Sequence, residues 1–297
     1  MSELVDVSPF AQVEELNGLP GHVVLADVRW YLDGRSGRAA YEGGHLPGAV
    51  FVDLDRRLTG PATPEGGRNP LPSPELFSEG MRALGINDDD IVVAYDDQSG
   101  VIAARLVWML RGTGRRAAVL DGGLAAYLQA HPDSLTVVEP APTEADFSVR
   151  AWPAEALAAA DEMVGPDVLA VDARNRDRFA GEQDPVDPRP GHVPGAVNVP
   201  CRENLDGQGR LLPVQRIRDN FAAAGVDQVS SPKVVSYCGS GVTACHNLLA
   251  LEYAGLRPGR LFVGGWSAYS RDESRPVETG LARWRLRPEF CETRPAV

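Results

Sequence analysis

Short apolar runs alternate with stretches of helical spacing along the whole chain. The runs are rich in Val, Ile, Leu and Ala, and each has the length of one buried strand; they cover residues 24–27, 91–95, 117–120, 168–172, 234–237 and 260–263. Strands of a parallel sheet are buried on both faces, so they read as apolar throughout instead of alternating. The pattern therefore predicts an α/β fold in which parallel sheets are flanked by helices.

The chain contains an internal repeat. Gly-His-x-Pro-Gly-Ala-Val occurs at 44–50 and again at 191–197, and a strand that ends in Asp-x-Arg precedes each copy. A Gly-Gly pair opens a helical segment at 122–127 and at 264–269. These motifs recur in the same order at a nearly constant offset, which indicates a duplicated domain.

The duplication divides the 297 residues into two domains. We expect the first domain at 1–135 and the second at 154–297. Between them, residues 136–153 contain three prolines and form a linker without regular structure. A long loop rich in proline and glycine, residues 59–74, interrupts the first half and has a shorter counterpart in the second.

One cysteine occupies a special place in this pattern. Cys238 follows the apolar run 234–237, and the small-residue loop 239–243 leads from it toward the helical segment 246–253. Such a loop can turn several backbone N–H groups toward one point, where the helix dipole adds positive potential. A thiol there ionises more readily than a free cysteine, and the thiolate is the nucleophilic form. The alternative is a cysteine that merely packs, and we assign that role to Cys201, Cys245 and Cys291.

The first half serves as an internal control for this chemistry. Its counterpart of Cys238 is Asp96, which is followed by Asp97. A carboxylate cannot supply a thiolate, and two carboxylates repel an anionic ligand. The duplication therefore predicts one active site, in the second half, with the first half forming part of its wall.

These features together resemble the tandem-domain rhodanese family of sulfurtransferases. The resemblance rests on the duplication, the two His-x-Pro-Gly-Ala turns and the loop Tyr-Cys-Gly-Ser-Gly-Val-Thr at 237–243, and it extends from residue 23 to residue 268. It implies two tandem rhodanese-like domains, of which the first is non-catalytic. Within that family, thiosulfate sulfurtransferases typically carry basic residues after the cysteine, whereas 3-mercaptopyruvate sulfurtransferases carry Gly-Ser-Gly-Val-Thr or Gly-Thr-Gly-Val-Thr. The loop of this chain is similar to the second group.

The resemblance implies a reaction in two steps. Cys238 takes sulfur from 3-mercaptopyruvate or thiosulfate as a persulfide and passes it to a thiol, to cyanide or to a protein. Candidate protein acceptors are thioredoxin-like proteins and sulfur carriers of cluster assembly. No cofactor and no metal is implied, and the spacing between Cys238 and Cys245 matches no common zinc site.

The resemblance also implies roles for individual residues. Ser240 would hand a proton to the departing pyruvate enolate. The arginine before Phe-x-Gly, Arg178, and the arginine of a Pro-Arg pair, Arg189, would bind the substrate carboxylate. A guanidinium suits this task because it can hold a carboxylate through two hydrogen bonds. The remaining substrate contacts would come from the loop itself: Gly239, Gly241, Val242 and Thr243.

Charge and composition exclude several other partners. The net charge is −12, which disfavours binding to nucleic acid or to an anionic membrane. An anionic substrate must therefore be attracted by local positive potential. The segment 1–20 is too acidic and too interrupted for a signal peptide, and no apolar stretch has the length of a membrane span, so we expect a cytoplasmic protein.

Two other functional classes compete with sulfur transfer. A cysteine phosphatase of related fold needs an arginine six positions after its cysteine to hold phosphate, and that position is Ala244. A non-enzymatic binding or scaffold protein fits the first half but not the second, whose nucleophile loop is complete. We assign structural roles to the paired His45 and His192, although His45 could approach the site from the first domain.

Overall fold

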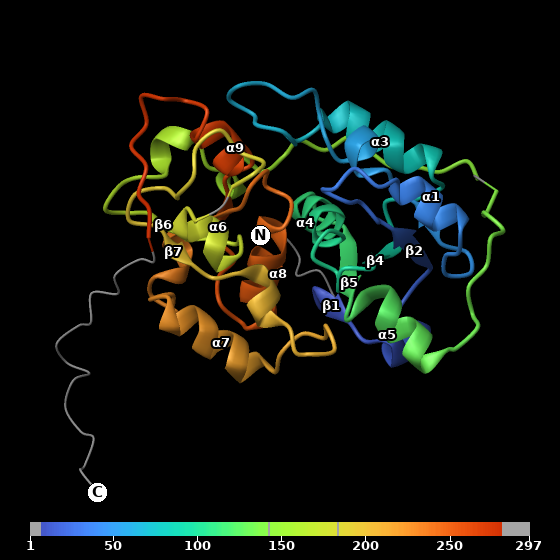
Figure 1. Ribbon diagram of the computed structural model, residues 1–297. Coiled ribbons are helices and arrows are strands. Elements are labelled where there is room, and N and C mark those ends of the chain that lie inside the picture. Colours follow the sequence, from blue (N-terminus) through green and yellow to red (C-terminus); the bar gives the residue numbers. More distant parts are fainter. Residues whose placement is uncertain (1–6, 142, 183, 281–297) are drawn as a thin grey trace, which may run out of the picture.

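The computed structural model describes residues 7–141, 143–182 and 184–280, so Cys291 lies outside the described part of the chain. Each half forms one sheet (Figure 1). The first sheet has five strands in the order β1-β5-β4-β2-β3, and the second has four in the order β7-β6-β8-β9. Every strand pair within the two sheets is parallel, as the apolar runs predict.

Helices and strands alternate in both halves. The first half contains β1 (Phe10–Ala11), η1 (Val13–Gly18), β2 (Val23–Asp27), α1 (Gly37–Glu42), β3 (Val50–Phe51), α2 (Leu54–Arg57), α3 (Pro74–Ala83), β4 (Ile91–Tyr95), α4 (Ala104–Gly112), β5 (Arg116–Leu120) and α5 (Gly123–Ala130). The second half contains η2 (Ala154–Ala156), η3 (Ala160–Glu162), β6 (Leu169–Asp172), α6 (Arg176–Ala180), β7 (Val197–Asn198), η4 (Cys201–Asn204), α7 (Val214–Ala223), η5 (Ser231–Lys233), β8 (Val234–Tyr237), α8 (Ala244–Tyr253), β9 (Arg260–Leu261) and α9 (Gly265–Tyr269). The longest helices in the described ranges have ten residues, too few to cross a bilayer.

The central strands lie where the apolar runs predict. β4 and β8 coincide with the predicted runs, and β2, β5 and β6 differ from theirs by one residue at the start. The edge strands β1, β3, β7 and β9 have only two residues each; β9 is two residues shorter than its run, and the pattern does not predict the other three. Two residues carry no periodicity of their own, and they pair because the neighbouring strand offers hydrogen-bond partners.

The two halves share one hydrophobic core. At its centre α4 packs against α8, and the two helices lie side by side in Figure 1. All residues from Ala104 to Leu110 of α4 and from Ala244 to Leu251 of α8 are buried. A helix that is buried on every side lies in an interior, so these helices join the halves instead of covering them. Because α8 follows the Cys238 loop, this contact also brings α4 close to that loop.

The repeated Asp-x-Arg motif forms the same ion pair in both halves. Arg29 pairs with Asp27 at 2.7 Å, and Arg174 pairs with Asp172 at 2.6 Å. Both guanidinium groups also donate a hydrogen bond to the carbonyl oxygen of the glycine that precedes the paired histidine. Each pair thus fastens a strand end to the following turn, which gives the repeated arginines a structural role.

The paired histidines stabilise these turns. His45 stacks on Tyr41 and His192 stacks on Phe179, with ring centroids 3.7 Å apart in both cases. Nδ1 of each histidine is hydrogen-bonded to the backbone carbonyl of its stacking partner, at 2.9 Å and 2.8 Å. Burial lowers the pKa of His192.

The predicted linker is bound to the first half over part of its length. Phe147 is buried and packs edge-on against Phe77, with ring centroids 5.8 Å apart. Arg115 lies over the Phe147 ring at 3.7 Å. Further along, the Trp152 indole N–H donates to the Pro72 carbonyl at 2.8 Å. The segment is irregular, as its prolines predict, but aromatic contacts anchor it.

The loop after β4 binds the carboxylate of Asp96, the residue with which it begins. Asp96 is fully buried, and its two oxygens accept four backbone hydrogen bonds of 2.7 to 2.8 Å; the donors are the N–H groups of Gln98, Gly100, Ile102 and Ala103. Burial raises the pKa of Asp96, and these four hydrogen bonds oppose the rise. The first half therefore contains an anion cradle that is filled by its own side chain.

Replacing Arg29 by methionine should strongly destabilise the protein. The change leaves the Asp27 carboxylate buried without its counter-charge, which costs about 3–5 kcal/mol. Urea unfolding at equilibrium measures the loss. Arg35→Met is the matched control, because the Arg35–Asp33 pair is exposed and its removal should change stability little. Equal losses in the two variants would contradict the role given to burial.

Asp96→Asn should also lower stability, by about 2–4 kcal/mol, because an amide nitrogen cannot accept the hydrogen bonds that one carboxylate oxygen accepts and leaves buried N–H groups unsatisfied. Thermal and urea unfolding measure the effect. The control is Asp97→Asn, which changes the neighbouring side chain that accepts a hydrogen bond from the Tyr31 hydroxyl. The cradle interpretation fails if Asp96→Asn is no less stable than this control.

Candidate active site

Cys238 lies directly after β8, at the carboxyl end of a central strand. Parallel sheets bind their ligands at this edge. The Cys238 side chain is only 3% exposed. The loop 239–243 then leads into α8, so the predicted strand–loop–helix arrangement around the cysteine is confirmed.

The carbonyl groups of this loop are held from behind. Two backbone N–H groups of α9 donate to the carbonyl oxygens of Cys238 and Gly239, at 2.7 Å and 2.8 Å. Gly241 O accepts a hydrogen bond of 3.1 Å from Nη1 of Arg105 in α4. Among the residues that the structure describes, the N–H groups of 239–243 have no protein acceptor. The loop thus presents donors that nothing in the protein uses.

One glycine of the loop is required by its surroundings. Gly241 has φ of +74°, and an added Cβ would lie 2.4 Å from the carbonyl oxygen of Val263. At Gly239 an added Cβ would meet only the movable end of the Arg68 side chain, 2.9 Å from its Nη2. The loop therefore depends on Gly241 for its backbone conformation.

A cavity of 250 Å³ opens over Cys238, and both halves line it. The first half contributes Trp30, Leu32, Arg68, Gln98 and Ile102. The predicted contribution of the first half to the wall of the site is confirmed. Three larger hollows, of 280, 580 and 630 Å³, lie elsewhere, and in the described ranges no cysteine lines any of them.

The cavity is cationic. The arginines that line it are Arg68, Arg174, Arg178 and Arg202. Two of them lie beside the loop. A Cβ added at Gly239 would be 2.9 Å from Nη2 of Arg68 and 3.5 Å from Nη1 of Arg178. An anion bound beside Cys238 would therefore meet two guanidinium groups.

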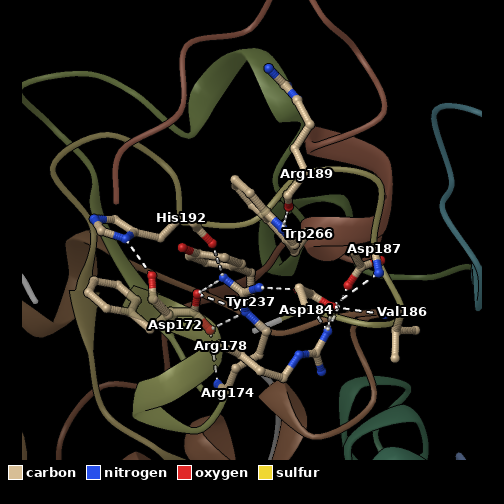
Figure 2. A network of polar contacts seen from close by, with 12 residues as sticks. Asp172, Arg174, Arg178, Asp184, Val186, Asp187, Arg189, His192, Tyr237 and Trp266 are labelled. Atoms are coloured by element: carbon tan, nitrogen blue, oxygen red, sulfur yellow. Dashed lines mark hydrogen bonds and ion pairs between the residues drawn. The ribbon is translucent and has the colours of Figure 1, made fainter. Parts of the chain in front are cut away.

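Two carboxylates of the loop between α6 and β7 fix these guanidinium groups (Figure 2). Arg178 Nη2 donates to Asp187 at 2.8 Å and to Asp184 at 3.0 Å. Arg68 reaches across from the first half and pairs with Asp187, while Arg174 pairs with Asp184 at 3.2 Å. Burial raises the pKa of Asp187, and the charge of Arg68 opposes the rise.

Arg189 does not reach this cavity. Its guanidinium donates to four backbone carbonyls that follow or end α9; they belong to Tyr269, Ser270, Asp272 and Arg275. Figure 2 shows the side chain pointing away from Arg178 and Asp184. The structure thus places the predicted partner of Arg178 on the outer side of its loop, where its hydrogen-bond donors are already used.

Most of the remaining predicted residues lie at the cavity. Ser240, Val242 and Thr243 line it together with Cys238 and Gly239, whereas Gly241 does not. The loop residues are therefore close enough together to act on one small ligand.

The other described cysteines take different positions. Cys201 is buried, as expected for a packing residue, but it also lines the cavity. Cys245 lies behind the loop, where its S–H donates to Gly241 O at 3.4 Å. Burial raises the pKa of both thiols to about 12. Both are therefore protonated near neutral pH and are weak nucleophiles.

The sequence pattern does not indicate that Arg68, Arg105 and Arg202 lie near Cys238. Arg68 belongs to the long loop 59–74, and its backbone N–H donates to the Ser267 hydroxyl of the second half at 3.1 Å. The only signal in the sequence is a single arginine after two glycines in an irregular segment. Such a segment gives no indication of which distant residue it contacts.

A metal centre finds no support in the side chains that the structure describes, because no group of three His, Cys, Asp or Glu is arranged to hold an ion.

Comparison with known proteins extends these observations over most of the chain. A family model described as "Rhodanese-like domain" matches twice, at residues 10–130 and 155–272. A probable 3-mercaptopyruvate sulfurtransferase from Pseudomonas aeruginosa is 40% identical over 270 residues, covering 87% of this chain and 93% of that protein. A Mycobacterium tuberculosis protein provisionally named a thiosulfate sulfurtransferase is 38% identical and covers 88% of this chain and 92% of its own length.

Solved structures give the same assignment. The 3-mercaptopyruvate sulfurtransferase from Leishmania major superposes with a TM-score of 0.78 at 31% identity, covering 89% of this chain and 74% of that one. SseA from Escherichia coli superposes with a TM-score of 0.75 at 32% identity and covers 88% of this chain and 100% of that one. Two matches of the family model and similarity over nearly the full length show that the chain belongs to the rhodanese family, with two tandem rhodanese-like domains.

Proposed function

We propose that this protein is a sulfurtransferase that carries sulfur as a persulfide on Cys238, with 3-mercaptopyruvate as the preferred donor. The observation that carries the proposal is the difference between two equivalent loops. In the first half four N–H groups bind the Asp96 carboxylate. In the second half the corresponding position is a thiol, and the N–H groups of 239–243 have no acceptor among the described residues. A sulfur anion on Cys238 would complete the second cradle.

The chemistry balances with Cys238 as nucleophile. The thiolate attacks the sulfur of 3-mercaptopyruvate, and an S–S bond forms while the C–S bond breaks. The electron pair of the broken bond stays on the departing pyruvate as its enolate. Ser240 relays a proton from solvent to that enolate, which gives pyruvate. A second thiolate then attacks the outer sulfur and leaves as the new persulfide, and Cys238 is restored.

Recognition of the donor carboxylate is proposed to rest on Arg178 and Arg68. Both guanidinium groups lie beside Gly239, directly next to the nucleophile. They come from different halves, and Asp187 binds both of them, so their positions are mutually fixed. A carboxylate held between them would place the neighbouring C–S bond of a three-carbon donor near Cys238.

Thiosulfate is the second candidate donor. The cationic lining could hold this dianion, and the Mycobacterium tuberculosis relative carries the corresponding name. Two features favour 3-mercaptopyruvate. The loop 239–243 contains no basic residue, and Asp184 and Asp187 already neutralise part of the charge of Arg68 and Arg178.

The sulfur acceptor is proposed to be a thiol, either small or on a protein such as a thioredoxin-like protein or a sulfur carrier. Cys201, Cys238 and Cys245 are all free thiols. Free thiols and thiol acceptors both persist in a reducing compartment such as the cytoplasm, which we propose as the site of action.

Treatment with 3-mercaptopyruvate should add one sulfur atom to Cys238. Mass spectrometry of the intact protein and of its peptides locates the addition. Cys238→Ser should take up no sulfur, whereas Cys201→Ser should still form the persulfide on Cys238, because Cys201 is a weakly nucleophilic thiol of the same cavity. Sulfur on another residue, or turnover by Cys238→Ser, would refute the proposed carrier.

Arg178→Gln and Arg68→Gln should each lower kcat/KM for 3-mercaptopyruvate about 10- to 100-fold, mainly through KM, because each removes a charge-assisted hydrogen bond to the carboxylate. Steady-state kinetics with both donors measure the effect. Arg189→Gln is the matched control; it removes four hydrogen bonds to backbone and should lower stability while leaving the kinetics of the folded protein nearly unchanged. A rise in KM in the Arg189 variant alone would reverse the assignment.

A further inference from the structure

Arg105 is an unusual residue for its position. It lies in α4 of the first half, has no exposed surface and occupies the core where α4 meets α8. Nη1 donates to Gly241 O in the Cys238 loop at 3.1 Å. Nη2 donates to Asn69 O at 3.1 Å and to Leu58 O at 3.4 Å, and Nε has no partner. Its hydrogen bonds thus go to backbone carbonyls.

Other buried arginines of the described residues have a carboxylate partner. Arg29 pairs with Asp27, Arg115 with Asp88 and Arg174 with Asp172, at 2.6 to 2.7 Å. No ion pair joins Arg105 to a carboxylate within the described ranges. A buried cation without a counter-charge costs several kcal/mol, so its presence calls for an anion that arrives during function.

The surroundings of Arg105 point to that anion. Nη1 of Arg105 and the S–H of Cys245 both donate to Gly241 O, at 3.1 Å and 3.4 Å, and the sulfurs of Cys245 and Cys238 both favour the protonated guanidinium. Burial lowers the pKa of Arg105, but a guanidinium remains protonated in proteins. Arg105 is fully buried between the halves, so its positive charge acts on the Cys238 sulfur with little screening by water or salt.

The duplicated half shows that this charge is specific to the cysteine side. Counted from Asp96 and Cys238, the position of Arg105 in α4 corresponds to Asn247 in α8, a neutral side chain. Asn247 is buried and bonds within the second half, where it accepts a hydrogen bond from Asn204 and donates one to the Val199 carbonyl. Of these two equivalent positions, the one that carries a charge is therefore the one whose side chain reaches the Cys238 loop.

We propose that Arg105 is a positioning residue that the first half contributes to sulfur transfer. It holds Gly241 O on the rear side of the loop, so that the N–H groups face the sulfur, and its unpaired charge stabilises the anionic sulfur of Cys238 and of the persulfide. The inference rests on the proposed function of Cys238. It explains how a loop without basic residues can stabilise an anion: the charge comes from behind it, across the domain boundary.

The test is the pH dependence of Cys238 alkylation by iodoacetamide, followed on the Cys238 peptide by mass spectrometry. Other charged or titratable groups that face this sulfur from the surrounding elements are Arg68, Arg174, Arg178, Cys201, Arg202 and Cys245. Arg105→Met is the main variant, because an apolar side chain in place of an unpaired buried charge is often tolerated. It should move the half-maximal alkylation rate to higher pH and slow alkylation at neutral pH about tenfold. Arg105→Lys keeps the charge and should restore most of the rate.

The matched control is Arg115→Met, which removes another buried arginine of the first half that pairs with Asp88. It should lower stability without changing the alkylation profile. An unchanged profile in Arg105→Met, or an equal shift in Arg105→Lys, overturns the proposal. If Arg105→Met does not fold, the uncharged Arg105→Gln decides: a shift to higher pH supports the charge, and a wild-type profile overturns the proposal. Alkylation needs no sulfur donor, so failure of persulfide formation would refute the proposed function separately.

Discussion

The contact between α4 and α8 is the constraint on which the site depends. Both helices are buried on all sides, so neither half can bury its own helix without the other. Because α8 begins where the Cys238 loop ends, the contact also decides what lies behind and above that loop. It brings Arg105 against Gly241 O, and it brings the loop 59–74 with Arg68 over the cavity. The site is therefore a product of the domain boundary.

Duplication has kept the backbone chemistry of the loop and changed its occupant. In the first half Asp96 supplies a permanent anion, and four N–H groups are satisfied within the folded chain. In the second half the carbonyls of Cys238, Gly239 and Gly241 are held by donors from α9 and α4, and the N–H groups are left for a ligand. One copy thus satisfies its N–H groups internally, and the other leaves them open beside a thiol.

The sequence predicts best where the signal is local. The strands β4 and β8 and the loop after Cys238 all follow from short runs of residues, and all are found where predicted. Arg178 lies in a helix next to its strand and reaches the cavity. Arg189 lies in an irregular loop, where the direction of a side chain depends on the nearest free acceptors. There it meets the carbonyls that end α9 and turns away.

The sequence alone determined the parallel α/β fold, the duplication and the place of Cys238 between a strand and a helix, because apolar runs, repeated motifs and the strand–cysteine–loop order are written in neighbouring residues. Tertiary structure alone decided which charges from the first half surround that cysteine. Arg68 and Arg105 belong to the first half and lie more than a hundred positions before Cys238. Packing of α4 against α8 brings them to the site, and no local pattern specifies the partner of an arginine that crosses a domain boundary.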